Sequence, residues 1–138
     1  MRAGTRDPIP GGGSDERPGR AARREDAIEL QLETRAEGTW TILDVGGEVD
    51  LSTAPALREQ LESLIAGGAR DLVVNLEQVG FMDSSGLGVL VAVQKRLAEA
   101  GGRMALVCRE GPTLKVLAIT GLDRVFPVHA SVADAVAS

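Results

Sequence analysis

The sequence is poor in aromatic residues and in cysteine, and both shortages limit what the protein can do. Its only aromatic side chains are Trp40, Phe81 and Phe126 among 138 residues. The core must therefore be built from aliphatic side chains, and stacking on nucleic-acid bases is disfavoured. A single cysteine, Cys108, excludes an internal disulfide and a multi-cysteine metal cluster, and it fits a reducing compartment. Because Cys108 ends an apolar segment, we expect it to be a small buried side chain.

Long hydrophobic runs and an excess of positive charge are also missing. No apolar run approaches the roughly 20 residues that a membrane span needs, and the arginine-rich N-terminus lacks the apolar region of a signal peptide. We therefore expect a cytoplasmic protein that does not contact the membrane. Six of the fifteen basic residues and four of the twenty acidic residues lie in residues 1–25, which leaves a net charge of −7 on residues 26–138. Such an acidic surface repels phosphate backbones, so nucleic acid is not an expected partner.

The chain divides near residue 26 into two parts of different composition. Residues 1–25 contain three prolines, a triple glycine and one isoleucine, which is too little apolar surface to offset the entropy of ordering the segment. We predict a disordered tail at 1–25 and one folded domain at 26–138. The tail is either a solvated appendage or a basic tether for an acidic partner.

Residues 26–138 alternate between strand and helix patterns. Period-two alternation predicts an antiparallel hairpin of strands 28–34 and 39–49 with a turn at 35–38. Further strands are predicted at 71–79, 103–108 and 124–128, the last at an edge because it contains Pro127. Helices are predicted at 50–68, 84–100, 112–120 and 131–137. The order predicts an α/β fold with a mixed central β-sheet flanked by α-helices.

The segment 80-GFMDSSGLGVLV-91 places Ser84 where a strand ends and a helix begins. The first backbone N–H groups of a helix have no partner inside it, and the helix dipole makes that end favourable for an anion such as a phosphate. Alternatively, Asp83, Ser84 or Ser85 simply caps the helix. The spacing alone leaves both interpretations open.

The first half of that helix, 86-GLGVLVAV-93, is apolar on every side. We expect one face to pack on the sheet through Leu87, Leu90, Val91 and Leu97, which leaves other faces to Gly86, Gly88, Val89, Ala92 and Val93. Small residues beside an exposed hydroxyl would let the backbone of a partner approach closely. An apolar surface of this kind indicates an interface, although burial against a neighbouring helix explains it equally well.

These segments resemble the STAS domain in its stand-alone anti-sigma-factor antagonist form. The resemblance extends over about residues 28–137 and is most specific where the DSSGLG turn follows GEVD at this spacing. It lies in 46-GGEVDLSTAPALREQL-61, 71-DLVVNLEQVGFMDSSGLGVLV-91, 101-GGRMALVC-108 and 114-LKVLAITGLDRVFPV-128.

The resemblance implies a protein that is not an enzyme and that binds an anti-sigma factor, which is itself an ATP-binding serine kinase, so that a sigma factor is released. It implies that the kinase inactivates the antagonist by phosphorylating Ser84 and that a metal-dependent serine phosphatase reverses the modification. No catalytic residue, metal site or cofactor is expected in this chain. Together with the apolar helix, the resemblance predicts a partner-binding surface of Asp83, Ser84, Ser85, Gly86, Gly88, Val89, Ala92, Glu48 and Asp50.

Other functional classes fit the sequence less well. A hydrolase nucleophile elbow needs glycine two residues on each side of the serine, but Met82 occupies one of those positions, and the only histidine, His129, is expected in an exposed loop or at a sheet edge. The glycines at 86–88 are too few and wrongly spaced for a nucleotide-binding loop. The main alternative is a STAS scaffold or interaction module in a stress-signalling or transport complex that does not act on a sigma factor. The identity of copurifying proteins would distinguish the two.

Overall fold

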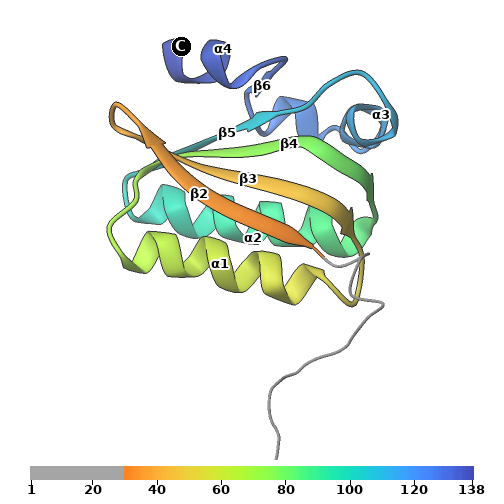
Figure 1. Cartoon of the computed structure of the whole chain (residues 1–138), viewed down its shortest axis with the longest axis horizontal. Coiled ribbons are helices and arrows are strands. Elements are labelled where there is room, and N and C mark those ends of the chain that lie inside the picture. The colour runs from red at the N-terminus through yellow and green to blue at the C-terminus, as the bar shows by residue number, and fades with distance from the viewer. Residues whose placement is uncertain (1–29) are drawn as a thin grey trace, which may run out of the picture.

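The computed structural model describes residues 30–138, which form one mixed sheet with helices on both of its faces (Figure 1). The five strands lie side by side in the order β2 (Gln31–Glu37), β3 (Trp40–Val49), β4 (Asp71–Met82), β5 (Arg103–Val107) and β6 (Val128–His129). β2 and β3 are antiparallel and the remaining neighbours are parallel. The predicted fold is confirmed, whereas the tail predicted at 1–25 lies outside the described residues.

Two helices, α1 (Ala54–Ala66) and α2 (Ser84–Glu99), pack side by side on one face of the sheet, and α4 (Val132–Ala137) covers part of the other face (Figure 1). The main core fills the space between the sheet, α1 and α2, and α3 (Pro112–Ile119) adds Leu117 to it. A smaller cluster under α4 joins Trp40, Ile42, Val73, Ala105, Val107 and Ala135. Trp40 is buried there, with the guanidinium of Arg103 4.4 Å from the centre of its ring.

The chain turns from β2 into β3 through only two residues, Gly38 and Thr39. Gly38 has φ of +61°, a backbone conformation that glycine adopts without steric cost. Glu37 and Trp40 are paired across this turn, so β2 continues through residues that were predicted to form the turn. The first two residues of the predicted strand 28–34 precede the described part of the chain.

The strand predicted at 124–128 is mostly absent, which is a correction to the sequence-based expectation. Residues Leu122–Arg124 form the short 3-10 helix η3, and β6 consists of only Val128 and His129. The apolar pattern of this segment arises because Phe126, 1% exposed, inserts into the main core from a loop. The carbonyl of Pro127 accepts a hydrogen bond from the Leu106 amide at 2.9 Å, which brings the chain into the sheet at its edge.

Candidate functional site

Ser84 is the first residue of α2 and follows the carboxyl end of β4. The residue before it, Asp83, is the N-cap: its Oδ1 accepts hydrogen bonds from the amides of Ser85 at 2.8 Å and Gly86 at 3.4 Å. The amide of Asp83 donates to the carbonyl of Val49 at 3.0 Å, which ties the start of α2 to the end of β3. Of the three candidate caps, the structure therefore selects Asp83.

The hydroxyl of Ser84 is not used by the fold. Ser84 is exposed, and within residues 30–138 its side chain makes no hydrogen bond, whereas the neighbouring Ser85 is half-buried. Because the Asp83 carboxylate caps the amides of Ser85 and Gly86, the Ser84 hydroxyl is not needed as the cap of this helix. The turn thus presents an accessible hydroxyl beside the positive end of a helix.

The GEVD loop lies at the same end of the sheet, since Val49 and Met82 are paired where β3 and β4 end. The carboxylate of Asp50 accepts hydrogen bonds from the Ser52 hydroxyl at 2.8 Å, the Ser52 amide at 2.9 Å and the Thr53 amide at 3.1 Å. These bonds, the one from the Ser52 hydroxyl above all, hold the pKa of Asp50 below its ordinary value. Asp50 is therefore a charged group in a turn that its own hydrogen bonds maintain.

Thr53 completes the loop and links it to β3. Its hydroxyl donates to the carbonyl of Glu48 at 2.8 Å and accepts from the Asp50 amide at 2.9 Å. The side chain of Glu48, near the end of β3, is exposed, and Asp50 lies in the turn that follows β3, so both predicted partner-binding acids lie beside the Ser84 turn. Sequence reasoning named both acids but missed the role of Thr53, although a threonine three residues after an aspartate is typical of such local bonding.

Two residues predicted to contact a partner are buried instead. Gly86 packs against the ends of β3 and β4 so closely that a Cβ there would lie 2.6 Å from Cγ1 of Val49 and 2.8 Å from Cγ of Met82. Val89 is 8% exposed and belongs to the main core. The expectation that Gly86 and Val89, together with Val93 at 0% exposure, lie away from the core is wrong. The strand ends cover Gly86, and α1 packs beside α2 and extends the buried side of α2 beyond the sheet.

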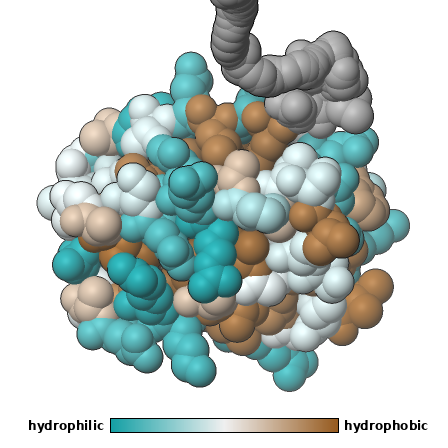
Figure 2. Space-filling model, turned by 90° about the horizontal axis from the view of Figure 1, so that it is seen from below, coloured by the Kyte–Doolittle hydropathy of each residue, from teal (hydrophilic) through white to brown (hydrophobic). Residues whose placement is uncertain are grey.

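Along its first three turns, α2 exposes a narrow stripe of Ser84, Gly88, Val91 and Lys95, which follow one another at helical spacing. The last turn of α2 is exposed more broadly. Val91, expected to face the sheet, is 38% exposed, while Ala92 at the margin of the stripe is half-buried. No heavy atom lies within 4 Å of a Cβ built on Gly88, so the helix backbone is open to approach there. Figure 2 looks onto this helical face and shows hydrophobic patches separated by polar side chains.

Two large apolar side chains that sequence reasoning did not single out lie at the same end of the sheet. Leu51, directly after Asp50, is 78% exposed, and Phe81, which is paired with Glu48 near the end of β4, is 47% exposed. Exposed apolar groups that gather near one turn indicate an interface. Leu51 lies between polar residues in a loop, and a large apolar side chain in that position could have been recognised from the sequence as a candidate contact residue.

The residues that a hydrolase would need are not brought together. His129 lies on β6, two strands away from β4, which confirms that it is a sheet-edge residue, and its ring nitrogen is 3.5 Å from the hydroxyl of Ser138. Cys108 is buried as expected, and burial raises the pKa of its thiol. Among residues 30–138 no three histidine, cysteine or carboxylate side chains are grouped as metal ligands. No helix of this part combines the length and the apolar character that crossing a bilayer demands.

Comparison with known proteins gives consistent results. The family model of the STAS domain matches residues 31–135. An anti-sigma-B factor antagonist of Staphylococcus aureus is 34% identical over 102 residues, which cover 74% of this chain and 94% of that protein. The crystal structure of an anti-sigma factor antagonist from Mycobacterium paratuberculosis superposes with a TM-score of 0.75 at 29% identity, over 80% of this chain and 93% of that chain. The Bacillus cell fate determinant SpoIIAA in its phosphorylated form superposes with a TM-score of 0.59 at 28% identity, over 78% of this chain and 96% of that one.

Proposed function

Because the chain belongs to the STAS domain family and, within it, to the anti-sigma factor antagonists, we propose that it binds an anti-sigma factor and is switched off by phosphorylation of Ser84. The bound anti-sigma factor would release its sigma factor. That anti-sigma factor is also the ATP-binding serine kinase that modifies Ser84, and a serine phosphatase restores the active form. The observation that carries the proposal is the exposed Ser84 hydroxyl, which the helix cap leaves free.

The unmodified protein would bind its partner through the exposed stripe of α2 and the neighbouring GEVD loop. Along this stripe the partner would meet the hydroxyl of Ser84, the open helix backbone at Gly88 and the apolar side chain of Val91. Leu51 extends the apolar part of the surface, and Asp50 adds a fixed charge. A stable complex buries about 800 Å² on each partner, so the interface would extend beyond these residues.

A phosphate on Ser84 would change this surface without disturbing the fold. It adds about −1.5 to −2 charges at neutral pH beside Asp83 and near the Asp50 loop. Two unit charges 4 Å apart interact by about 4 kcal/mol at an effective dielectric constant of 20, so a phosphate pressed against a carboxylate of a partner weakens binding more than about a hundredfold. The start of α2 offsets this by only about 0.3–2 kcal/mol. Repulsion therefore prevails at the interface.

The proposal assigns no catalytic chemistry to this chain. Other proteins phosphorylate and dephosphorylate Ser84: the kinase supplies the ATP, and the phosphatase supplies its own metal. Such a switch would act in the cytoplasm, where sigma factors meet RNA polymerase.

The test is site-resolved mass spectrometry and copurification on the full chain expressed in its own cells, comparing wild type, Ser84→Ala and the matched neighbour Ser85→Ala. We expect one phosphate on wild type and on Ser85→Ala, none on Ser84→Ala, and an ATP-binding kinase bound permanently to Ser84→Ala. Ser84→Asp should bind that kinase poorly, although one carboxylate carries less charge than a phosphate.

Two results would contradict the proposal. Phosphorylation of Ser84→Ala to the wild-type level would refute the site, and equal kinase affinity of the phosphorylated and unphosphorylated protein would refute the switch. Copurification with a partner that is not a kinase would favour the scaffold alternative instead.

A further inference from the structure

β2 forms an edge of the sheet among the described strands. Its seven residues are nearly all exposed, and it is paired with β3 on one side only. An edge strand presents unpaired backbone N–H and C=O groups, which can pair with a strand of another chain.

The register with β3 shows which backbone groups of β2 point outward. The two-residue turn pairs Glu37 with Trp40, and hydrogen-bonded and non-bonded pairs alternate along an antiparallel ladder from that point. Glu37, Arg35 and Glu33 therefore bond to β3. The backbone groups of the residues between them, Thr34 at the centre, face the free edge.

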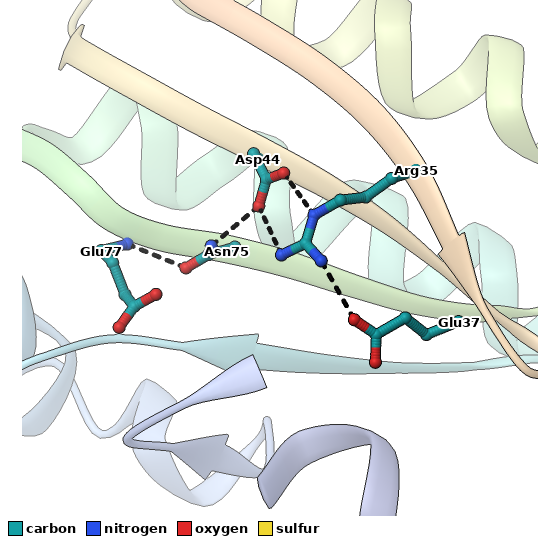
Figure 3. A network of polar contacts seen from close by, with 5 residues as sticks. All are labelled: Arg35, Glu37, Asp44, Asn75 and Glu77. Carbon is teal, nitrogen blue, oxygen red and sulfur yellow. Dashed lines mark hydrogen bonds and ion pairs between the residues drawn. The ribbon is translucent and has the colours of Figure 1, made fainter. Parts of the chain in front are cut away.

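The charges on the outer side of β2 are incompletely paired within one chain. Arg35 donates to both carboxylate oxygens of Asp44, at 2.7 and 3.2 Å, and to Glu37 at 3.1 Å (Figure 3). Glu33 stands directly opposite Asp44 in the register, so two acids face each other. Within residues 30–138 Glu33 has no ion pair, and like charges opposite each other destabilise a strand pair.

The sequence of β2, 31-QLETRAE-37, is complementary to itself when it is read against a reversed copy. A twofold axis at Thr34 places Glu33 opposite Arg35 of the second copy, and Arg35 opposite its Glu33. On the other side of the strand the same axis places Leu32 opposite Ala36. We propose that two copies of this chain associate through antiparallel pairing of their β2 strands about Thr34.

This pairing gives a partner to Glu33, which has no ion pair among residues 30–138, because each Glu33 gains a cation from the other copy while Arg35 keeps Asp44. The occupant is a second copy of this chain because the charge pattern matches itself. The contact is a single pair of strands, so the dimer is weak and depends on concentration. Ser84 follows β4 and lies outside β2, so both copies keep the proposed partner-binding surface on α2. The dimer therefore does not depend on the proposed function.

The test is sedimentation equilibrium of the full chain from micromolar to millimolar concentration, with charge-reversal variants of β2. Glu33→Arg carries arginine at both positions 33 and 35, and Arg35→Glu carries glutamate at both, so each opposes its own copy. We expect each variant alone to dimerise at least about tenfold more weakly than wild type, because two cross-strand charge pairs become repulsive. An equimolar mixture of the two should recover wild-type affinity as a heterodimer.

Two controls keep the experiment decisive. Glu99→Arg makes the same change of charge at an exposed position on α2 and should dimerise like wild type. The double variant Glu33→Arg/Arg35→Glu should dimerise by itself, and its arginine at position 33 stands opposite Asp44, so it retains an intrachain ion pair. Circular dichroism verifies that each variant is folded.

A wild-type chain that stays monomeric at every concentration would overturn the inference. So would a mixture that associates no more tightly than either single variant, or a dimer that is insensitive to all β2 changes. Pairing of β2 with a strand of another protein, with no self-association of this chain, would also overturn it.

Discussion

Replacing Gly86 with alanine tests whether the start of α2 is held against the strand ends as tightly as the structure indicates. The added Cβ would lie 2.6 Å from Cγ1 of Val49 and 2.8 Å from Cγ of Met82. Both side chains are almost fully buried, at 0% and 3% exposure, so neither can move aside freely. Overpacking of this kind costs about 1–3 kcal/mol. Alanine regains about 1 kcal/mol of helix propensity over glycine, so we expect a net loss of up to about 2 kcal/mol.

Gly88, two residues along the same helix, is the matched control. It is exposed, and no heavy atom lies within 4 Å of a Cβ built there. Gly88→Ala therefore gains helix propensity without a clash and should stabilise the protein by about 0.5–1 kcal/mol.

Urea and thermal unfolding, followed by circular dichroism and by the fluorescence of Trp40, measure both changes. For a domain of about 100 residues each kcal/mol shifts the melting temperature by about 4–8 °C, so the two variants should melt on opposite sides of wild type. If Gly86→Ala proves as stable as Gly88→Ala, the close packing of the first turn of α2 is refuted.

Two further variants test the hydrogen bonds of the site and of the sheet. Asp83→Ala removes the N-cap of α2 and should lower the free energy of unfolding by about 1 kcal/mol, whereas Ser84→Ala should change it by less than about 0.5 kcal/mol; equal losses in urea would contradict the separate roles of these residues. The hydrogen bond from Arg35, followed by that from Asn75, lowers the pKa of Asp44 in the folded state, so its contribution to stability is present above the ordinary value of 3.8 and is lost as the pH falls through the lowered value. Asp44→Asn should therefore lose less stability than wild type in urea titrations between about pH 5 and pH 2, and an unchanged pH profile would count against the Arg35–Asp44 pair.

Most of the fold can be predicted from local periodicity. The four predicted helices and the predicted strands other than 124–128 are all present. The segment 124–128 fails because one buried residue, Phe126, produces the apolar pattern of a strand in a loop. Five residues are too few to distinguish a strand from a loop that buries one apolar side chain in the core.

The candidate site is only partly predictable for a similar reason. The position of Ser84 at a strand-to-helix turn follows from local pattern, but which side of α2 is buried depends on α1, which is distant in sequence. Val89 and Val91 exchange their expected environments as a result. The sequence offers Asp83, Ser84 and Ser85 equally as caps of α2. Only the backbone geometry of the turn decides that Asp83 is the cap.

The allocation of the cap to Asp83 also bears on how this surface can change over evolutionary time. Asp83 stabilises the helix and Ser84 presents the exposed hydroxyl, so a mutation of Ser84 does not unfold the protein and is not removed by selection for folding. If Ser84 is phosphorylated as proposed, a duplicated copy of the gene can lose that hydroxyl by a single mutation and persist as a folded form that escapes the proposed regulation, or regain the hydroxyl later by reversion. The proposed regulation therefore depends on a position that can change without loss of the fold.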